Sequence, residues 1–71
     1  MVLLTGATGT VGAALLRRFV ASGEAVRCLV RSPRRLGDQR VRVQITLGDL
    51  AEPLSFRHAL RGVDTVVHLA A

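Results

Sequence analysis

The feature that most constrains this chain is a cluster of three glycines close to its N-terminus. Gly6, Gly9 and Gly12 stand between the apolar run at residues 2–5 and a stretch at 10–22 whose apolar residues recur at helical spacing. Glycine weakens helices and loses more conformational entropy on folding than other residues, so three glycines at a helix start require a reason. We predict a buried strand, a tight turn and a helix from about Thr10 to Ser22.

Each glycine has a separate task in that arrangement. Gly6 permits the sharp turn out of the strand, and Gly9 lets a pyrophosphate approach the bare backbone. Gly12 falls on the apolar face of the helix, where the missing Cβ allows the helix to press against the sheet. The first free amides of the helix, those of Thr10 and Val11, and the positive end of its dipole then face the pyrophosphate.

The competing interpretation of this segment is a glycine-rich turn that binds nothing. A Walker-type phosphate loop is excluded, because no Gly-Lys-Ser/Thr follows and the chain has no Lys. The strand–turn–helix context favours a dinucleotide site. The residues to which we assign cofactor binding in this segment are Gly6, Thr8, Gly9, Thr10, Val11 and Gly12.

The rest of the chain alternates strands and helices. We predict strands at 25–30, 41–47 and 63–69, and a short helix from Pro53 to about Arg61. An Arg-rich connection with at most one helical turn follows the second strand. This alternation indicates parallel pairing in a doubly wound α/β sheet with strand order 3-2-1-4. The all-apolar first strand suits the centre, and the alternating third strand suits an edge.

Composition limits the class of protein. The 71 residues allow one small domain, and a hydrophobic fraction of 49% excludes a disordered tail. No apolar stretch approaches the roughly 20 residues of a membrane helix, and the first apolar residues do not have the pattern expected of a signal peptide. The single Cys28 cannot form an internal disulfide and has no metal-ligand spacing around it, so we interpret it as a core residue. These features predict a cytoplasmic protein that binds neither a membrane nor a metal.

The predicted fourth strand is the second edge of the sheet and is nearly all apolar. An exposed apolar edge promotes association, and the chain stops there without a covering helix. We therefore expect residues 1–71 to be a partial Rossmann domain, as a fragment, a truncated reading frame or a half that needs a partner. The alternative is self-association through this strand.

The basic residues indicate an anionic partner. The net charge of +5 comes from ten Arg and no Lys. Arg31 ends the second strand, where NAD-binding domains carry an acidic residue for the ribose hydroxyls, so a guanidinium there predicts a contact to the 2′-phosphate of NADP. For Arg34 and Arg35 a phosphate contact and a solvated loop both remain open. Asp49, after the third strand, is by itself better explained as a turn residue than as an adenine contact.

Four segments together resemble the short-chain dehydrogenase/reductase superfamily, above all its extended and atypical members such as the epimerase/dehydratases. They are the glycine segment, Leu29-Val30-Arg31-Ser32-Pro33, Gly48-Asp49-Leu50, and the final stretch at 63–71. The resemblance implies that Asp49 and Leu50 hold the adenine of NADP or NAD. It also implies that His68, Ala70 and Ala71 line the cofactor cleft near a ribose.

The chain departs from that superfamily in its catalytic residues. The superfamily's Tyr-x-x-x-Lys pair lies further along, and this sequence contains no Tyr and no Lys, so no catalytic residue is assigned. We predict an NADP-preferring half-domain of an oxidoreductase or a sugar-nucleotide epimerase/dehydratase. One alternative is a non-catalytic sensor that binds NADP. The other is a basic nucleic-acid-binding module, which we do not expect because aromatic stacking residues are lacking.

Overall fold

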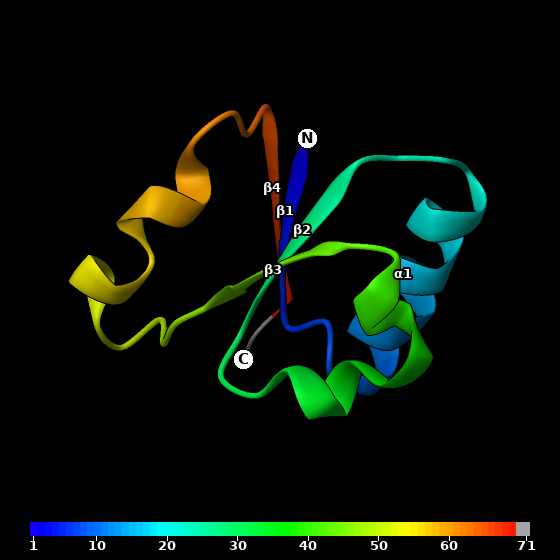
Figure 1. Cartoon of the computed structure of the whole chain (residues 1–71), viewed down its shortest axis with the longest axis horizontal. Helices are drawn as coiled ribbons and strands as arrows, with labels where there is room; N and C mark the ends of the chain where they lie inside the picture. Colours follow the sequence, from blue (N-terminus) through cyan, green and yellow to red (C-terminus); the bar gives the residue numbers. More distant parts are fainter. Residues whose placement is uncertain (70–71) are drawn as a thin grey trace.

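The chain folds around one parallel β-sheet with helical segments on both faces (Figure 1). The computed structural model describes residues 1–69. The elements in chain order are β1 (Val2–Thr5), α1 (Thr10–Ala21), β2 (Val26–Val30), the 3₁₀ segment η1 (Pro33–Val41), β3 (Gln44–Leu47), the 3₁₀ turns η2 (Pro53–Ser55) and η3 (Arg57–Leu60), and β4 (Thr65–His68). The strand order β3-β2-β1-β4 confirms the predicted α/β class and topology.

The centre of the sheet is its most buried part. Strand β1 pairs with β2 on one side and with β4 on the other, all in parallel, and β3 pairs with the outer side of β2. Leu4 stands in register with Cys28 of β2 and Val67 of β4, and both Leu4 and Cys28 are fully buried. A strand covered on both faces is expected to be apolar, as β1 is from Val2 to Leu4.

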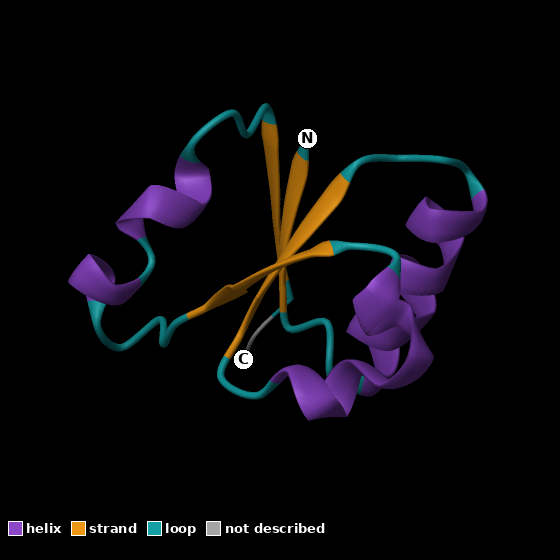
Figure 2. Ribbon diagram, viewed as in Figure 1, coloured by secondary structure: helices purple, strands orange, loops and turns teal. Residues whose placement is uncertain are grey.

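Two hydrophobic clusters fasten the helical segments to opposite faces of the sheet. Helix α1 and η1 cover one face, where Leu16 and Leu36 pack around Leu4 (Figure 2). The η2–η3 segment covers the other, where Ala59 packs with Leu29 and Leu3. The chain thus leaves β1 on one side of the sheet and leaves β3 on the other.

The structure corrects four details of the sequence prediction. The helix predicted over 53–61 is two separate 3₁₀ turns, η2 and η3, divided at Phe56. Strand β3 is shorter than 41–47, and Val41, predicted to face inward, is 80% exposed. The connection after β2 is more helical than the single turn expected, with a kink at Gly37, where φ is 60°. Val11 belongs to the apolar helical repeat over 10–22, which predicts a buried side chain, but it is exposed in α1.

A side-chain clamp explains why η3 stays against the sheet although it is short. Arg27 of β2 donates hydrogen bonds to the backbone carbonyls of Ala59 and Arg61, and its Nε donates to Gln44 Oε1 at 3.0 Å. Carbonyls at the end of a helical turn lack partners within the turn, and a guanidinium satisfies them well.

Within residues 1–69, no helix is both long and apolar enough to cross a bilayer.

Candidate functional site

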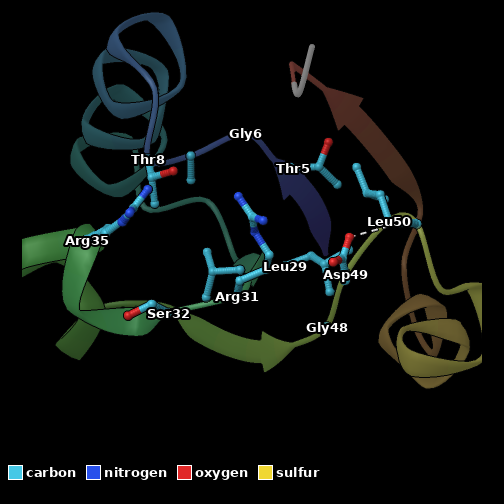
Figure 3. Close-up of a pocket in the computed structure, with 13 residues that line it drawn as sticks. Thr5, Gly6, Thr8, Leu29, Arg31, Ser32, Arg35, Gly48, Asp49 and Leu50 are labelled. Carbon is cyan, nitrogen blue, oxygen red and sulfur yellow. Dashed lines mark hydrogen bonds between the residues drawn. The ribbon is translucent and has the colours of Figure 1, made fainter.

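A cleft of about 620 Å³ opens where the strands end (Figure 3). Because β1, β2 and β3 are parallel, their carboxyl ends meet at one edge of the sheet, and the segments that follow them form the walls. The chain leaves β1 and β3 toward opposite faces, so segments from both faces border this edge at the carboxyl ends of the strands. In open α/β sheets that is where ligands bind.

The first wall is the turn between β1 and α1. Gly6 has a φ of 82°, a left-handed conformation that suits glycine, and the Gly9 amide donates to the Gly6 carbonyl at 3.2 Å. Helix α1 has no capping side chain and no acidic residue in its first turn. The amides of residues 10–12 have no hydrogen-bond partner within residues 1–69. Such free amides at the positive end of a helix dipole form an anion-binding site.

Gly12 lets the helix start lie directly on that turn. A Cβ at position 12 would be 1.9 Å from the Gly6 carbonyl oxygen and 3.0 Å from the Ala7 Cα. The close approach predicted from the sequence is therefore present, but its partner is the glycine turn rather than the sheet. At Gly9 a Cβ would meet the same oxygen at an ordinary 3.6 Å, so folding alone does not require glycine there.

The second wall supplies positive charge. Arg31 follows β2 and extends into the middle of the cleft, and Arg35 of η1 reaches toward Thr8 (Figure 3). Arg34 does not line the cleft. Within the part of the chain that the structure describes, the one ion pair joins the N-terminal ammonium to Asp64, so no carboxylate neutralises the two guanidinium groups.

The third wall follows β3 and carries the cleft's acidic group. Asp49 Oδ1 accepts a hydrogen bond from the Ala51 amide at 2.9 Å, which is the turn role that its sequence position suggested. Leu50, 39% exposed, stands beside it in the cleft. Ser55 Oγ lies within 3.0 Å of the Asp49 amide nitrogen, so η2 holds this wall from outside the cleft.

The floor of the cleft is the last row of the sheet. Thr5, 3% exposed, lies next to His68 of β4, and Thr5 Oγ1 and His68 Nδ1 are 2.6 Å apart. His68 itself does not line the cleft.

Burial raises the pKa of the nearby Cys28 thiol to about 11, so it stays protonated and is a core residue rather than a nucleophile.

The structure brings together only part of the predicted site. The predicted residues that line the cleft are Gly6, Thr8, Arg31, Asp49 and Leu50. The four residues from Gly9 to Gly12 form the adjoining helix start and do not line it. Ala70 and Ala71 lie outside the described residues.

Sequence reasoning left several residues of the site unassigned and one open. Thr5 lines the floor, Gly48 lines the third wall, and Ser55 holds that wall. Arg35, which the sequence left undecided, is in the cleft. The available signal was its place in the Arg-rich connection that leaves the carboxyl end of β2, the same end of the sheet as Arg31.

Comparison with known proteins decides which ligand such a cleft belongs to. Residues 6–71 match a protein family described as NAD(P)H-binding, and this match covers nearly the whole chain. The chain belongs to this NAD(P)H-binding family. The predicted nicotinamide-nucleotide cofactor is thereby confirmed in its general form, without distinction between NADP and NAD.

Named proteins similar to this chain include a reductase, a sterol demethylase protein and an epimerase. Dihydroflavonol 4-reductase of Zea mays is 38% identical over 78 residues, covering 97% of this chain and 22% of that protein. Sterol demethylase protein B of Methylococcus capsulatus is 41% identical over 70 residues, covering 97% of this chain and 21% of that protein. UDP-glucose 4-epimerase of Rickettsia conorii is 33% identical over 79 residues, covering 97% of this chain and 23% of that protein.

A solved structure confirms the fold. The crystal structure of gox2253 superimposes with a TM-score of 0.86 at 35% identity, covering all of this chain and 22% of that one. The chain thus spans about a fifth of the length of the relatives it matches. These relatives confirm the resemblance to the extended short-chain dehydrogenase/reductases, and the chain is an NAD(P)-binding domain of the reductase and epimerase type.

Proposed function

We propose that the cleft binds NADP in preference to NAD. The observation that carries this proposal is the convergence of two unneutralised guanidinium groups, from Arg31 and Arg35, on a cleft that the free amides of α1 adjoin. NADP differs from NAD by one 2′-phosphate on the adenosine ribose. A planar guanidinium matches a phosphate through two parallel hydrogen bonds, and an acidic side chain at the Arg31 position would repel it.

The pyrophosphate is assigned to the start of α1. Thr10 and Val11 carry amides available to its oxygens, Gly9 leaves the backbone bare for its approach, and no acidic residue in the first turn opposes the charge. Gly6 and Thr8 line the adjoining part of the cleft. Gly12 contributes indirectly, by allowing α1 to lie close enough to the turn for this geometry to form.

The adenine is assigned to the wall after β3. One carboxylate oxygen of Asp49 is used by the Ala51 amide, and the other is available to accept a hydrogen bond from the adenine 6-amino group. Leu50 offers an apolar surface to the ring. The remaining two assignments, Ala70 and Ala71 near a ribose, rest on the superfamily resemblance alone.

In a protein of the relatives' length, the bound nicotinamide supplies hydride exchange with a carbonyl or alcohol group. The residues of this chain bind and orient the nucleotide, because the acid–base pair of the superfamily has no counterpart among them. We assign the whole protein to the oxidoreductases or sugar-nucleotide epimerase/dehydratases on the strength of its named relatives.

The partner of the fourth strand is proposed to be a second copy of the chain. Within residues 1–69 the outer edge of β4 pairs with no strand, and Val66 on it is 51% exposed. An apolar strand edge with unpaired backbone groups is a template for pairing with another chain.

The location of the protein is proposed to be a reducing compartment such as the cytoplasm, because the thiol of Cys28 is unpaired.

The test of the cofactor proposal is a pair of arginine variants titrated with NADP and NAD by calorimetry. Loss of a charge-assisted hydrogen-bonded contact costs about 1.5–3 kcal/mol, so Arg31→Ala should weaken NADP binding by about 10- to 100-fold and leave NAD binding nearly unchanged. Arg34→Ala is the matched control, since it removes the same charge from a residue outside the cleft. Equal losses for the two nucleotides in Arg31→Ala would refute the 2′-phosphate assignment.

A further inference from the structure

The Ser55 side chain makes three hydrogen bonds to backbone groups of the segment after β3, which is the third wall of the cleft. Ser55 ends η2, six residues after Asp49 and outside the cleft. Its Oγ accepts a hydrogen bond from the Asp49 amide at 3.0 Å. The hydroxyl proton is shared between the carbonyl of Glu52, at 2.7 Å, and that of Asp49 itself, at 3.1 Å. One hydroxyl therefore contacts both backbone groups of Asp49, whose carbonyl also accepts a hydrogen bond from the Glu52 amide at 2.9 Å.

The neighbouring packing leaves this segment little freedom. A Cβ on Gly48 would lie 3.0 Å from the Ser55 carbonyl oxygen and 3.0 Å from Leu29 Cδ1, so the wall lies tightly between η2 and the sheet. On the cleft side, the Ala51 amide holds one oxygen of the Asp49 carboxylate. The direction of the second oxygen thus follows from a backbone that Ser55 holds in place.

We propose that Ser55 is a positioning residue for recognition of the base: by holding the Asp49 backbone it aims the carboxylate at the 6-amino group of a purine. This inference rests on the proposed NADP site and specifies what sets its choice of base. A carboxylate accepts from the amino group of adenine, whereas hypoxanthine presents a carbonyl oxygen at that position and repels it. A carboxylate that is free to turn away loses this discrimination.

The experiment compares NADP with its hypoxanthine analogue by calorimetry, in the unmodified chain and in Ser55→Ala. We expect the unmodified chain to favour NADP by about tenfold, the size of a hydrogen bond to a charged group, and Ser55→Ala to reduce the ratio to within about twofold of one. A purely structural role would lower both affinities together and leave their ratio unchanged.

The matched control is Ser22→Ala, which removes another serine hydroxyl bonded to a backbone carbonyl, that of Arg18, at the far end of α1. Ser22→Ala should keep the full ratio of the affinity for NADP to the affinity for the hypoxanthine analogue. If Ser55→Ala does not fold, Ser55→Cys replaces the hydroxyl with a thiol that is a weak hydrogen-bonding group, and its ratio should also fall.

The outcomes separate this inference from the cofactor proposal. No NADP binding by the unmodified chain would refute the cofactor proposal and this inference with it. NADP binding with no preference over the hypoxanthine analogue, or a preference that persists in the Ser55 variant, would overturn the positioning role alone. Loss of the ratio in Ser55→Ala with its retention in Ser22→Ala is the supporting result.

Discussion

Replacing Gly12 with alanine should destabilise the whole fold through a single added methyl group. The new Cβ would lie 1.9 Å from the Gly6 carbonyl oxygen and 2.7 Å from the Gly6 carbonyl carbon. Both are backbone atoms, so no side-chain rotation relieves the contact. To reach ordinary van der Waals separation, α1 and the turn must move apart by about 1.5 Å.

The energetic consequence follows from two opposing terms. Forcing a methyl group into a closely packed site costs about 3 kcal/mol at the upper end of the usual range, which a backbone collision justifies. Alanine returns about 1 kcal/mol through its better helix propensity. The net loss of about 2 kcal/mol lowers the melting temperature of a domain this small by about 10 °C. Thermal unfolding followed by circular dichroism measures it.

Two further variants test whether the backbone collision is the cause of the lower melting temperature of Gly12→Ala. Ala14→Gly, at an exposed position of α1, costs about 1 kcal/mol through propensity alone and should leave the NADP affinity of the folded chain unchanged. Gly9→Ala meets only an ordinary 3.6 Å contact, so its melting temperature should stay within about 3 °C while NADP affinity falls about tenfold, because the methyl group blocks the approach of the pyrophosphate. If Gly12→Ala melts within about 3 °C of the unmodified chain, the packing argument is wrong.

The remaining predictions concern the core thiol and the sheet edge. The pKa of Cys28 is about 11 in the fold against 9.0 for the free thiol, so the unfolded chain loses its proton first, and stability should fall by about 1.4 kcal/mol per pH unit from pH 9 to 11. The chain has no Tyr or Lys to titrate in this window, so urea unfolding of Cys28→Ala should be nearly independent of pH there. For the β4 edge, sedimentation velocity should show concentration-dependent dimers that Val66→Lys disrupts. A monomer at all concentrations would exclude self-association.

The topology was predictable because it depends on patterns local in sequence. Buried parallel strands read as short apolar runs, and β1 is such a run in both sequence and structure. The alternation over 41–47 indicated an edge strand, which β3 is, but only Gln44–Leu47 pairs with β2. Val41 follows the alternating pattern and is nevertheless exposed, since it ends η1 rather than starting a strand.

The helix predicted from Pro53 failed because side chains compete for its backbone groups. The Ser55 hydroxyl bonds the Glu52 carbonyl, which would accept the first helical bond of a continuous helix. The Arg27 guanidinium takes the carbonyls of Ala59 and Arg61 at the other end. Neither competitor is visible in the amphipathic pattern, because Arg27 lies some thirty residues earlier in the chain.

The two ends of the candidate site differ in what their sequence reveals. Its phosphate side is built from contacts within one short segment, where Gly12 lies on Gly6, and glycine spacing alone reveals it. Its base side depends on Ser55, which contacts Asp49 across the same separation of six residues. A serine at that distance from an aspartate forms no recognisable motif, whereas the three glycines do. Choice of base therefore depends on a hydroxyl outside the glycine motif, so changes around η2 can alter specificity while that motif stays intact.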